Sequence, residues 1–352
     1  MTINPRMISL ARESRGLTQT ELAKKMGIAI SSVSRLEFGY IDADDSLDLL
    51  SDVLNYPKSF FSQTFQIQPP NIHYRKRLTL SPKIIRKADA LMNIYRGNIE
   101  KMLTLIRLEE ANLPIVTDNK YASPRKLAAY LRSFWNLPKG PIKDLVTLVE
   151  KHGIIVILFD FETDKIDGRS MITDDGHPVI FLNHLFPGER QRLTLAHELG
   201  HICMHMKTFP TFARDEEQEA FEFASEFLMP EFEIRYDLST KLTIEKLGDL
   251  KRLWKMSMAA LLHWAEKLKC ITPNQSRYLW TQYSANGYKR GEPLPIYIDP
   301  PTLLTRMLNL YIEAQELANR KDSEDEVAKI FSLNSQEFKD KFISHAKVLR
   351  VA

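Results

Sequence analysis

The chain contains 352 residues, of which 44% are hydrophobic and 26% are charged, and its formal net charge is only +3. These values are typical of a globular protein of two or three domains, and the small net charge excludes a chain that is basic throughout. Two cysteines exclude a disulfide scaffold and a multi-cysteine zinc finger. Because the N-terminus lacks a signal layout and the longest apolar stretch, residues 153–159, is too short to cross a bilayer, we expect a cytoplasmic protein with no membrane partner.

Short helices are expected over residues 1–65. Apolar residues recur there at spacings of three and four, and Gly16, Gly27, Gly39 and Pro57 punctuate them. Residues 66–114 are expected to form a basic helical linker, since residues 66–110 carry nine basic side chains against four acidic ones. A local basic surface of this kind attracts phosphate, so contact with DNA could extend into this segment.

Residues 115–240 combine helical and strand patterns. Strands are expected at residues 153–160, 168–172 and 178–183, and helices at residues 123–136, 187–206 and 216–228. Residues 241–298 are expected to form a helical extension and residues 299–352 a helical tail. The fold class is therefore multidomain, with an all-α unit, an α+β unit with a small sheet, and a helical C-terminal region.

The segment LTQTELAKKMGIAISSVSRLEFG, residues 17–39, has the pattern of a helix-turn-helix. Thr18 and Glu21 form a capping box, and Gly27 permits the tight turn. In the second helix Ile30, Val33 and Leu36 are expected to face inward, whereas Ser31, Ser32 and Arg35 face outward with side chains suited to a major groove. A helical packing unit that binds only protein would show the same apolar spacing.

The whole string resembles lambda-repressor-like domains of the xenobiotic-response-element type. The resemblance implies that Gln19 touches a phosphate and the operator edge, that Ile30, Ser31, Ser32 and Arg35 face the bases, and that Arg12 pairs with Glu37 as a structural contact. Because Ile30 is apolar, base reading would rest mainly on Arg35, with Ile30 at most touching a thymine methyl. Such domains bind double-stranded DNA, usually as dimers, so a homodimer is expected.

A metallopeptidase signature lies in LTLAHELGHICMH, residues 193–205. His197 and His201 are four residues apart, so both imidazoles lie on one helix face and both can reach one Zn²⁺. Glu198 lies beside them and can act as the general base. His205 lies one turn further on the same face and is expected near the site, as a supporting group or a substrate contact, but not on the metal, since a fourth protein ligand would block catalysis.

A third ligand is expected on the helix DEEQEAFEFASEFLMP, residues 215–230, where Glu219 and Glu226 flank the apolar stripe. Together, HELGH and this string resemble the ImmA/IrrE family of zinc metallopeptidases over roughly residues 115–235. In that family the third ligand is a glutamate on the helix after HExxH. Glu219 is the best match, and Glu217 is the alternative.

The resemblance implies a zincin-like fold and a zinc endopeptidase fused to a DNA-binding domain. Members of this family cleave DNA-bound repressors in stress or mobile-element circuits, so the implied substrate is a helix-turn-helix repressor or another copy of this chain. The alternative is a transcriptional regulator whose metallopeptidase-like domain senses a ligand or partner and cleaves nothing. The presence of Glu198 favours the enzyme, because a sensor has no need of a base.

Overall fold

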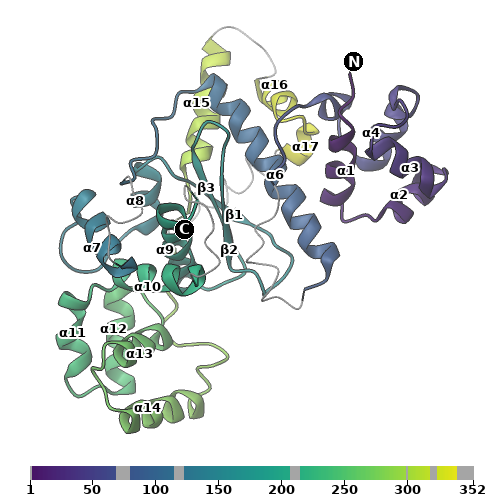
Figure 1. The fold of residues 1–352 in the computed structure, drawn as a ribbon. Helices are drawn as coiled ribbons and strands as arrows, with labels where there is room; N and C mark the ends of the chain where they lie inside the picture. Colours follow the sequence, from purple (N-terminus) through teal and green to yellow (C-terminus); the bar gives the residue numbers. More distant parts are fainter. Residues whose placement is uncertain are drawn as a thin grey trace.

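The order of helices and strands follows the expected division into an all-α part, a part with a small sheet, and a helical C-terminal part (Figure 1). The computed structural model describes residues 2–68, 80–114, 123–206, 215–298, 300–317 and 323–338. The basic run at residues 73–77 lies outside the described residues. No described helix is long and apolar enough to span a membrane.

The N-terminal part is a bundle of short helices around one apolar centre. The capping box of Thr18 and Glu21 starts the helix Gln19–Met26, and Gly27 ends the same helix in the left-handed conformation with φ 67°. Both features are as expected from the sequence, and they set the sharp turn between the two helices of the motif. The elements are α1 (Pro5–Ser14), α2 (Gln19–Met26), α3 (Ile30–Glu37), η1 (Asp44–Ser46), α4 (Leu47–Leu54) and η2 (Lys58–Ser62).

A mixed three-stranded sheet forms the centre of the molecule. Its strands are β1 (Ile155–Phe159), β2 (Gly168–Ile172) and β3 (Pro178–Asn183). The order is β1-β3-β2, with β1 parallel and β2 antiparallel to β3. Since β3 is central, all six of its residues are buried. The strands coincide closely with the three segments expected from the sequence, residues 153–160, 168–172 and 178–183.

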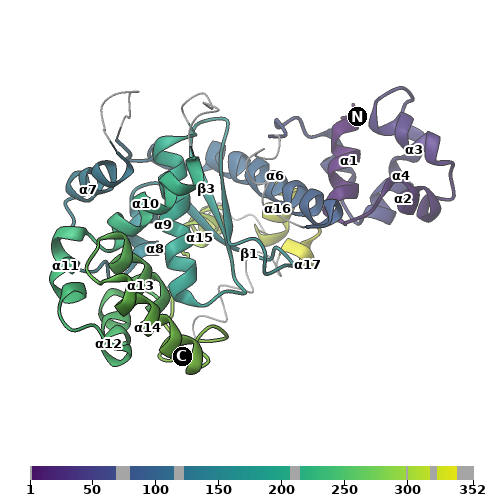
Figure 2. The same cartoon turned by 60° about the horizontal axis from the view of Figure 1, so that its bottom comes forward.

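The two faces of the sheet carry different helices (Figures 1 and 2). Even-numbered residues such as Val156 and Ile180 belong to the apolar core that includes α9 (Gly188–Met204) and α10 (Glu216–Leu228). Odd-numbered residues such as Ile157 and Phe181 belong to a second core, which continues into α6 (Pro82–Leu105) and the N-terminal helices. This division follows from the alternation of side chains along a strand.

Gly168 and Gly200 allow α9 to approach its neighbours closely. A Cβ atom on Gly168 would lie 2.6 Å from the Thr194 side chain, and one on Gly200 would lie 3.0 Å from the ring of Phe223. The first contact joins β2 to α9, and the second joins α9 to α10. The two glycines therefore bring the edge strand, the HExxH helix and the following helix together.

The basic segment around α6 belongs to the folded core and is not a free linker. Arg96 is fully buried and pairs with Glu100 and with Asp174 in the β2–β3 turn. Three basic side chains of α6 thus have acidic partners on other parts of the chain: Lys83 with Glu21, Lys87 with Glu162, and Arg96 with Asp174. These pairs give acidic partners to three of the basic side chains that the sequence had suggested for phosphate, whereas Arg86 and Arg107 are exposed.

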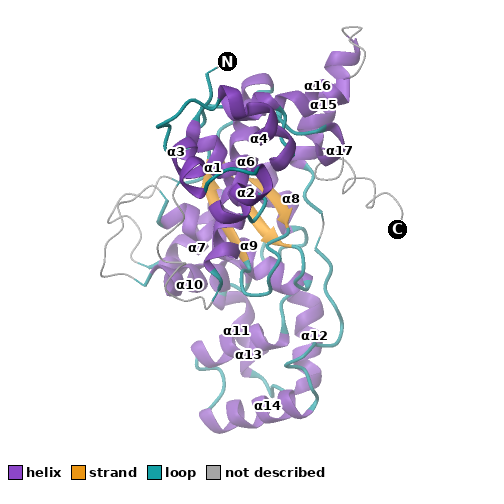
Figure 3. Ribbon diagram, turned by 90° about the vertical axis from the view of Figure 1, so that its right-hand side faces the viewer, coloured by secondary structure: helices purple, strands orange, loops and turns teal. Residues whose placement is uncertain are grey.

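The C-terminal part has two separate roles in the architecture. Residues 231–285 form a helical group below the sheet in Figure 3. Its helices are α11 (Glu231–Ser239), α12 (Ile244–Trp254), α13 (Met258–Lys267) and α14 (Pro273–Ala285). The chain then returns to the sheet face that carries α6, where apolar side chains of α15 (Leu303–Leu317), α16 (Ser323–Ile330) and α17 (Ser335–Phe338) join the same core.

Two further helices complete the α+β part. They are α7 (Pro124–Phe134) and α8 (Leu145–Lys151). At the end of α8, Glu150 accepts hydrogen bonds from the backbone of Thr302 and Leu303 at the start of α15. A carboxylate at a helix N-terminus satisfies amides that have no partner within the helix. Glu150 therefore fixes the start of the tail against the α+β part.

Candidate metal centre and DNA-binding helix

Three side chains from α9 and α10 converge on one point. The Nε2 atoms of His197 and His201 are 3.1 Å apart, and each lies 3.5 Å from a carboxylate oxygen of Glu217. The potential ligand atoms all lie within 4.8 Å of one another. His197 and His201 are one turn apart on α9, as expected, and α10 supplies the carboxylate across the close contact at Gly200.

This arrangement fits a zinc ion. Two ligand atoms bound to one tetrahedral zinc at about 2.0–2.1 Å lie roughly 3.3 Å apart. The observed separations of 3.1 and 3.5 Å bracket that value. Two imidazoles and one carboxylate are also a known ligand set of catalytic zinc, which keeps its fourth position open.

Glu217 occupies the position that the sequence had assigned to Glu219. The Oε2 atom of Glu219 lies 3.0 Å from Nε2 of His205, which is one turn beyond His201. Residues two apart on a helix point about 200° apart around its axis, so Glu217 and Glu219 cannot face the same point. In this geometry the alternative, Glu217, therefore faces His197 and His201, whereas Glu219 faces His205.

The charges of the cluster favour a cation between its members. Hydrogen bonds from His197 and His201 hold the pKa of Glu217 well below its usual range, although its burial acts in the opposite direction. Burial opposes protonation of His201, but the hydrogen bond to Glu217 and the charge of Glu198 outweigh it and raise the pKa of His201. A metal ion bound between these groups would supply the positive charge that the carboxylates of Glu217 and Glu198 favour.

Glu198 lies beside this cluster and is held by the sheet. Its Oε2 atom accepts a 2.7 Å hydrogen bond from the hydroxyl of Ser170 on β2. The side chain is buried, with 8% of its surface exposed. Ser170 was not singled out from the sequence; its even-numbered position on a strand facing α9 was the signal that could have identified it.

The helix-turn-helix presents one helix away from the rest of the molecule (Figure 1). On α3, Ile30, Ser31 and Arg35 are exposed and Ser32 is partly exposed. Ile30 was expected to face inward, but 48% of its surface is exposed, because it is the first residue of α3 and lies at the edge of the packed face. The outward face of α3 is therefore available to a partner.

A buried polar network holds the three helices of this unit. Arg12 donates to both carboxylate oxygens of Glu37, at 2.5 and 3.2 Å, and to the carbonyl of Leu17. Gln19 donates to the same carboxylate at 2.7 Å. The Arg12–Glu37 pair is thus the structural contact that the resemblance implied. An amide carries two N–H groups, so Gln19 retains one for a phosphate.

Comparison with known families assigns both parts of the chain. The family model of the IrrE N-terminal-like domain matches residues 149–266, and a helix-turn-helix family model matches residues 8–61. The chain joins an N-terminal helix-turn-helix domain to an ImmA/IrrE-type domain. A search of curated proteins finds no match to the chain. The first match indicates a zincin-like peptidase domain of a kind that generally binds zinc, and the second indicates a DNA-binding regulator.

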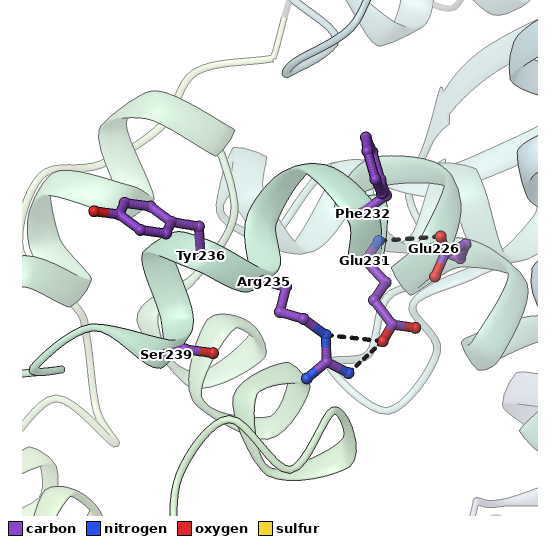
Figure 4. Close-up of a pocket in the computed structure, with 6 residues that line it drawn as sticks. All are labelled: Glu226, Glu231, Phe232, Arg235, Tyr236 and Ser239. Carbon is purple, nitrogen blue, oxygen red and sulfur yellow. Dashed lines mark hydrogen bonds and ion pairs between the residues drawn. The ribbon is translucent and has the colours of Figure 1, made fainter.

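A cavity of about 670 Å³ in the ImmA/IrrE-type domain lies along α11, outside the cluster of His197, His201 and Glu217 (Figure 4). Its wall includes Glu226, which the sequence had placed beside Glu219 at the edge of the apolar stripe of α10. Glu226 accepts hydrogen bonds from Arg125 and from the backbone of Glu231. The charged groups at this cavity are thus paired with one another, and Glu226 has a structural role.

Proposed function

We propose that this protein is a DNA-binding regulator with a zinc-dependent endopeptidase activity. The observation that carries the proposal is the convergence of His197, His201 and Glu217 beside Glu198. Two imidazoles and a carboxylate would hold the zinc, and the neighbouring carboxylate would provide the base. The match to the IrrE N-terminal-like domain supports this interpretation.

The chemistry divides between the metal and Glu198. When bound, zinc would polarise the scissile carbonyl and lower the pKa of the attacking water. Glu198 would take a proton from that water and transfer it to the leaving amine. Ser170 holds one carboxylate oxygen of Glu198, so the other oxygen is the natural proton acceptor. A base held within hydrogen-bond reach in this way loses little freedom when the substrate binds.

We propose a DNA-bound repressor, or another copy of this chain, as the substrate. The helix-turn-helix match supports binding to duplex DNA, and the exposed face of α3 is where Ser31, Ser32, Arg35 and Ile30 would meet it. A dimer would place two such helices about one helical turn of DNA apart. Colocalisation on DNA would raise the local concentration of enzyme around a bound substrate.

The metal site is tested by zinc analysis of the purified chain. We expect about one zinc per chain and its loss in the His197→Ala/His201→Ala variant. Glu217→Ala should also lose most of the metal, because Glu217 is the third ligand, whereas Glu222→Gln on the same helix should keep it. Full zinc content in the double histidine variant would refute the proposed site.

The activity is tested with Glu198→Gln, which keeps the shape of the side chain but removes the base. The variant should retain zinc and DNA binding and lose cleavage of helix-turn-helix repressors or of the protein itself, assayed with and without DNA. Equal cleavage by both proteins would exclude Glu198 as the base. Zinc and DNA binding without cleavage of any repressor by the wild type would favour the alternative, a non-cleaving sensor.

A further inference from the structure

A row of three histidines runs along one face of α9 and its C-terminus. Beyond the pair of His197 and His201, His205 follows at the C-terminal end of the helix. Its Nδ1 atom lies 3.0 Å from Nδ1 of His201, and its Nε2 atom lies 3.0 Å from Oε2 of Glu219. The side chain of His205 is buried, with 7% exposed, and that of Glu219 is 21% exposed.

One assignment of protons satisfies the contact between His201 and His205 and the contact between His205 and Glu219. A metal at Nε2 of His201 requires a lone pair there, so the ring proton of neutral His201 must be on Nδ1. This proton is then donated to Nδ1 of His205, which must be the acceptor. His205 therefore carries its own proton on Nε2 and donates it to the carboxylate of Glu219. Each of these two contacts has one donor and one acceptor, and the row ends on the carboxylate of Glu219.

We propose that His205 and Glu219 are positioning residues that orient the ring of His201 and make its Nε2 a stronger metal ligand. This inference rests on the proposed zinc site. It gives Glu219, which the sequence had assigned as the third metal ligand, a role in orienting a ligand instead. A hydrogen bond from the distal nitrogen of a ligand histidine to an acceptor fixes both tautomer and ring orientation. Here the carboxylate exerts this effect through an intervening imidazole.

The two ligand histidines differ in this respect. Nδ1 of His197 is buried and has no hydrogen-bond partner among the described residues. Its ring instead lies against Phe221, with 4.3 Å between the ring centroids. His197 is thus held by packing and His201 by hydrogen bonds. Changes at His205 and Glu219 should therefore act on the metal through His201 alone.

The test measures the zinc dissociation constant of the full-length protein in competition with a chromogenic chelator. His205→Leu introduces an apolar side chain of moderate size without the two ring nitrogens, and we expect zinc binding about 10- to 100-fold weaker. The number of zinc ions bound at saturation should remain one per chain. His205→Asn places an acceptor close to the position of Nδ1 and should recover part of the lost affinity.

Variants at Glu219 test the far end of the row. Glu219→Leu should weaken zinc binding, and Glu219→Gln should weaken it less, because its amide oxygen still accepts from His205. Since Glu219 acts through His205, the His205→Leu/Glu219→Leu double variant should bind zinc no more weakly than His205→Leu alone. Glu222→Gln is the matched control, because Glu222 is on the same helix but pairs with Lys267.

A spectroscopic measurement separates positioning from loss of folded protein. In the Co²⁺-substituted protein, His205→Leu should alter the visible absorption bands while the far-ultraviolet circular dichroism stays unchanged, because the orientation of one ligand changes and the helices do not. If His205→Leu proves unfolded, the comparison of Glu219→Leu with Glu219→Gln decides the question.

Three results are distinguishable. Wild-type zinc affinity and an unaltered Co²⁺ spectrum in His205→Leu would overturn the positioning role. A fall in the number of bound zinc ions at saturation would also overturn it, since His205 would then be a ligand. Retention of zinc by His197→Ala/His201→Ala would instead refute the metal site itself, independently of His205.

Discussion

Removing Glu37 should loosen the DNA-binding unit, because this carboxylate joins α1, α2 and α3. In Glu37→Ala the guanidinium of Arg12, which is 7% exposed, loses two hydrogen bonds and the amide of Gln19 loses one. Breaking a buried pair by removing one partner costs about 3–5 kcal/mol. Arg12 keeps the carbonyl of Leu17 and a 3.4 Å contact to Glu13, so we take the lower end, about 3 kcal/mol.

Hydrogen–deuterium exchange of the full-length protein measures this loss locally, because opening of one unit need not follow unfolding of the whole chain. A cost of about 3 kcal/mol corresponds to exchange of the slowest amides in α1–α3 roughly 100-fold faster. Amides of β3 should be unaffected. The Arg12→Met/Glu37→Ala double variant should be less destabilised than the sum of the single variants, since no charge is left buried. A change below twofold in Glu37→Ala would refute the reasoning.

Three further predictions concern base reading, pH and packing. Arg35→Ala should weaken binding to a selected operator by about 1–3 kcal/mol and should reduce the ratio of operator affinity to the affinity for unrelated DNA, as measured by competition binding. An unchanged ratio would contradict base reading by Arg35. Burial lowers the pKa of Lys101 to about 8. Between pH 8 and 10.5 the folded protein has lost this proton while the unfolded chain still binds it, so the free energy of unfolding of the wild type should rise with pH, by at most about 3 kcal/mol. Denaturation curves of Lys101→Met at the two pH values should lack this rise. Gly168→Ala, whose Cβ would lie 2.6 Å from the methyl of Thr194, should destabilise by about 1–3 kcal/mol, whereas Gly291→Ala, with nothing within 4 Å, should melt like the wild type.

Local patterns were sufficient to predict most of the secondary structure. The three expected strand segments became β1, β2 and β3, and the expected helices at residues 187–206 and 216–228 became α9 and α10 within two residues. Strong local signals explain this success, since caps such as Ser123-Pro124 set helix starts independently of the fold. Strand order could not be obtained in this way, because pairing across β1-β3-β2 depends on contacts distant in sequence.

The third carboxylate and the basic segment show what local patterns could not decide. Glu217 and Glu219 are both acidic residues in the first turn of α10, and only the rotation of that helix against α9 decides which one faces His197. The charges around α6 suggested a solvated surface, yet Arg96 is fully buried because Asp174 and Glu100 neutralise it. Neither acidic partner could be assigned without the tertiary structure.

The packing of α6 also has a consequence for geometry along DNA. The N-terminal helices, α6 and one face of the sheet share a single apolar core, so α3 is packed on the same body of the protein that carries the cluster of His197, His201 and Glu217. When one copy of the protein binds an operator, the cluster of His197, His201 and Glu217 then faces one side of the DNA duplex. B-DNA turns once in about 10.5 base pairs, so a substrate whose site is shifted by about five base pairs would lie on the opposite side of the duplex from the cluster. Cleavage between neighbouring sites should consequently oscillate with their spacing, as the helical phase of the duplex does.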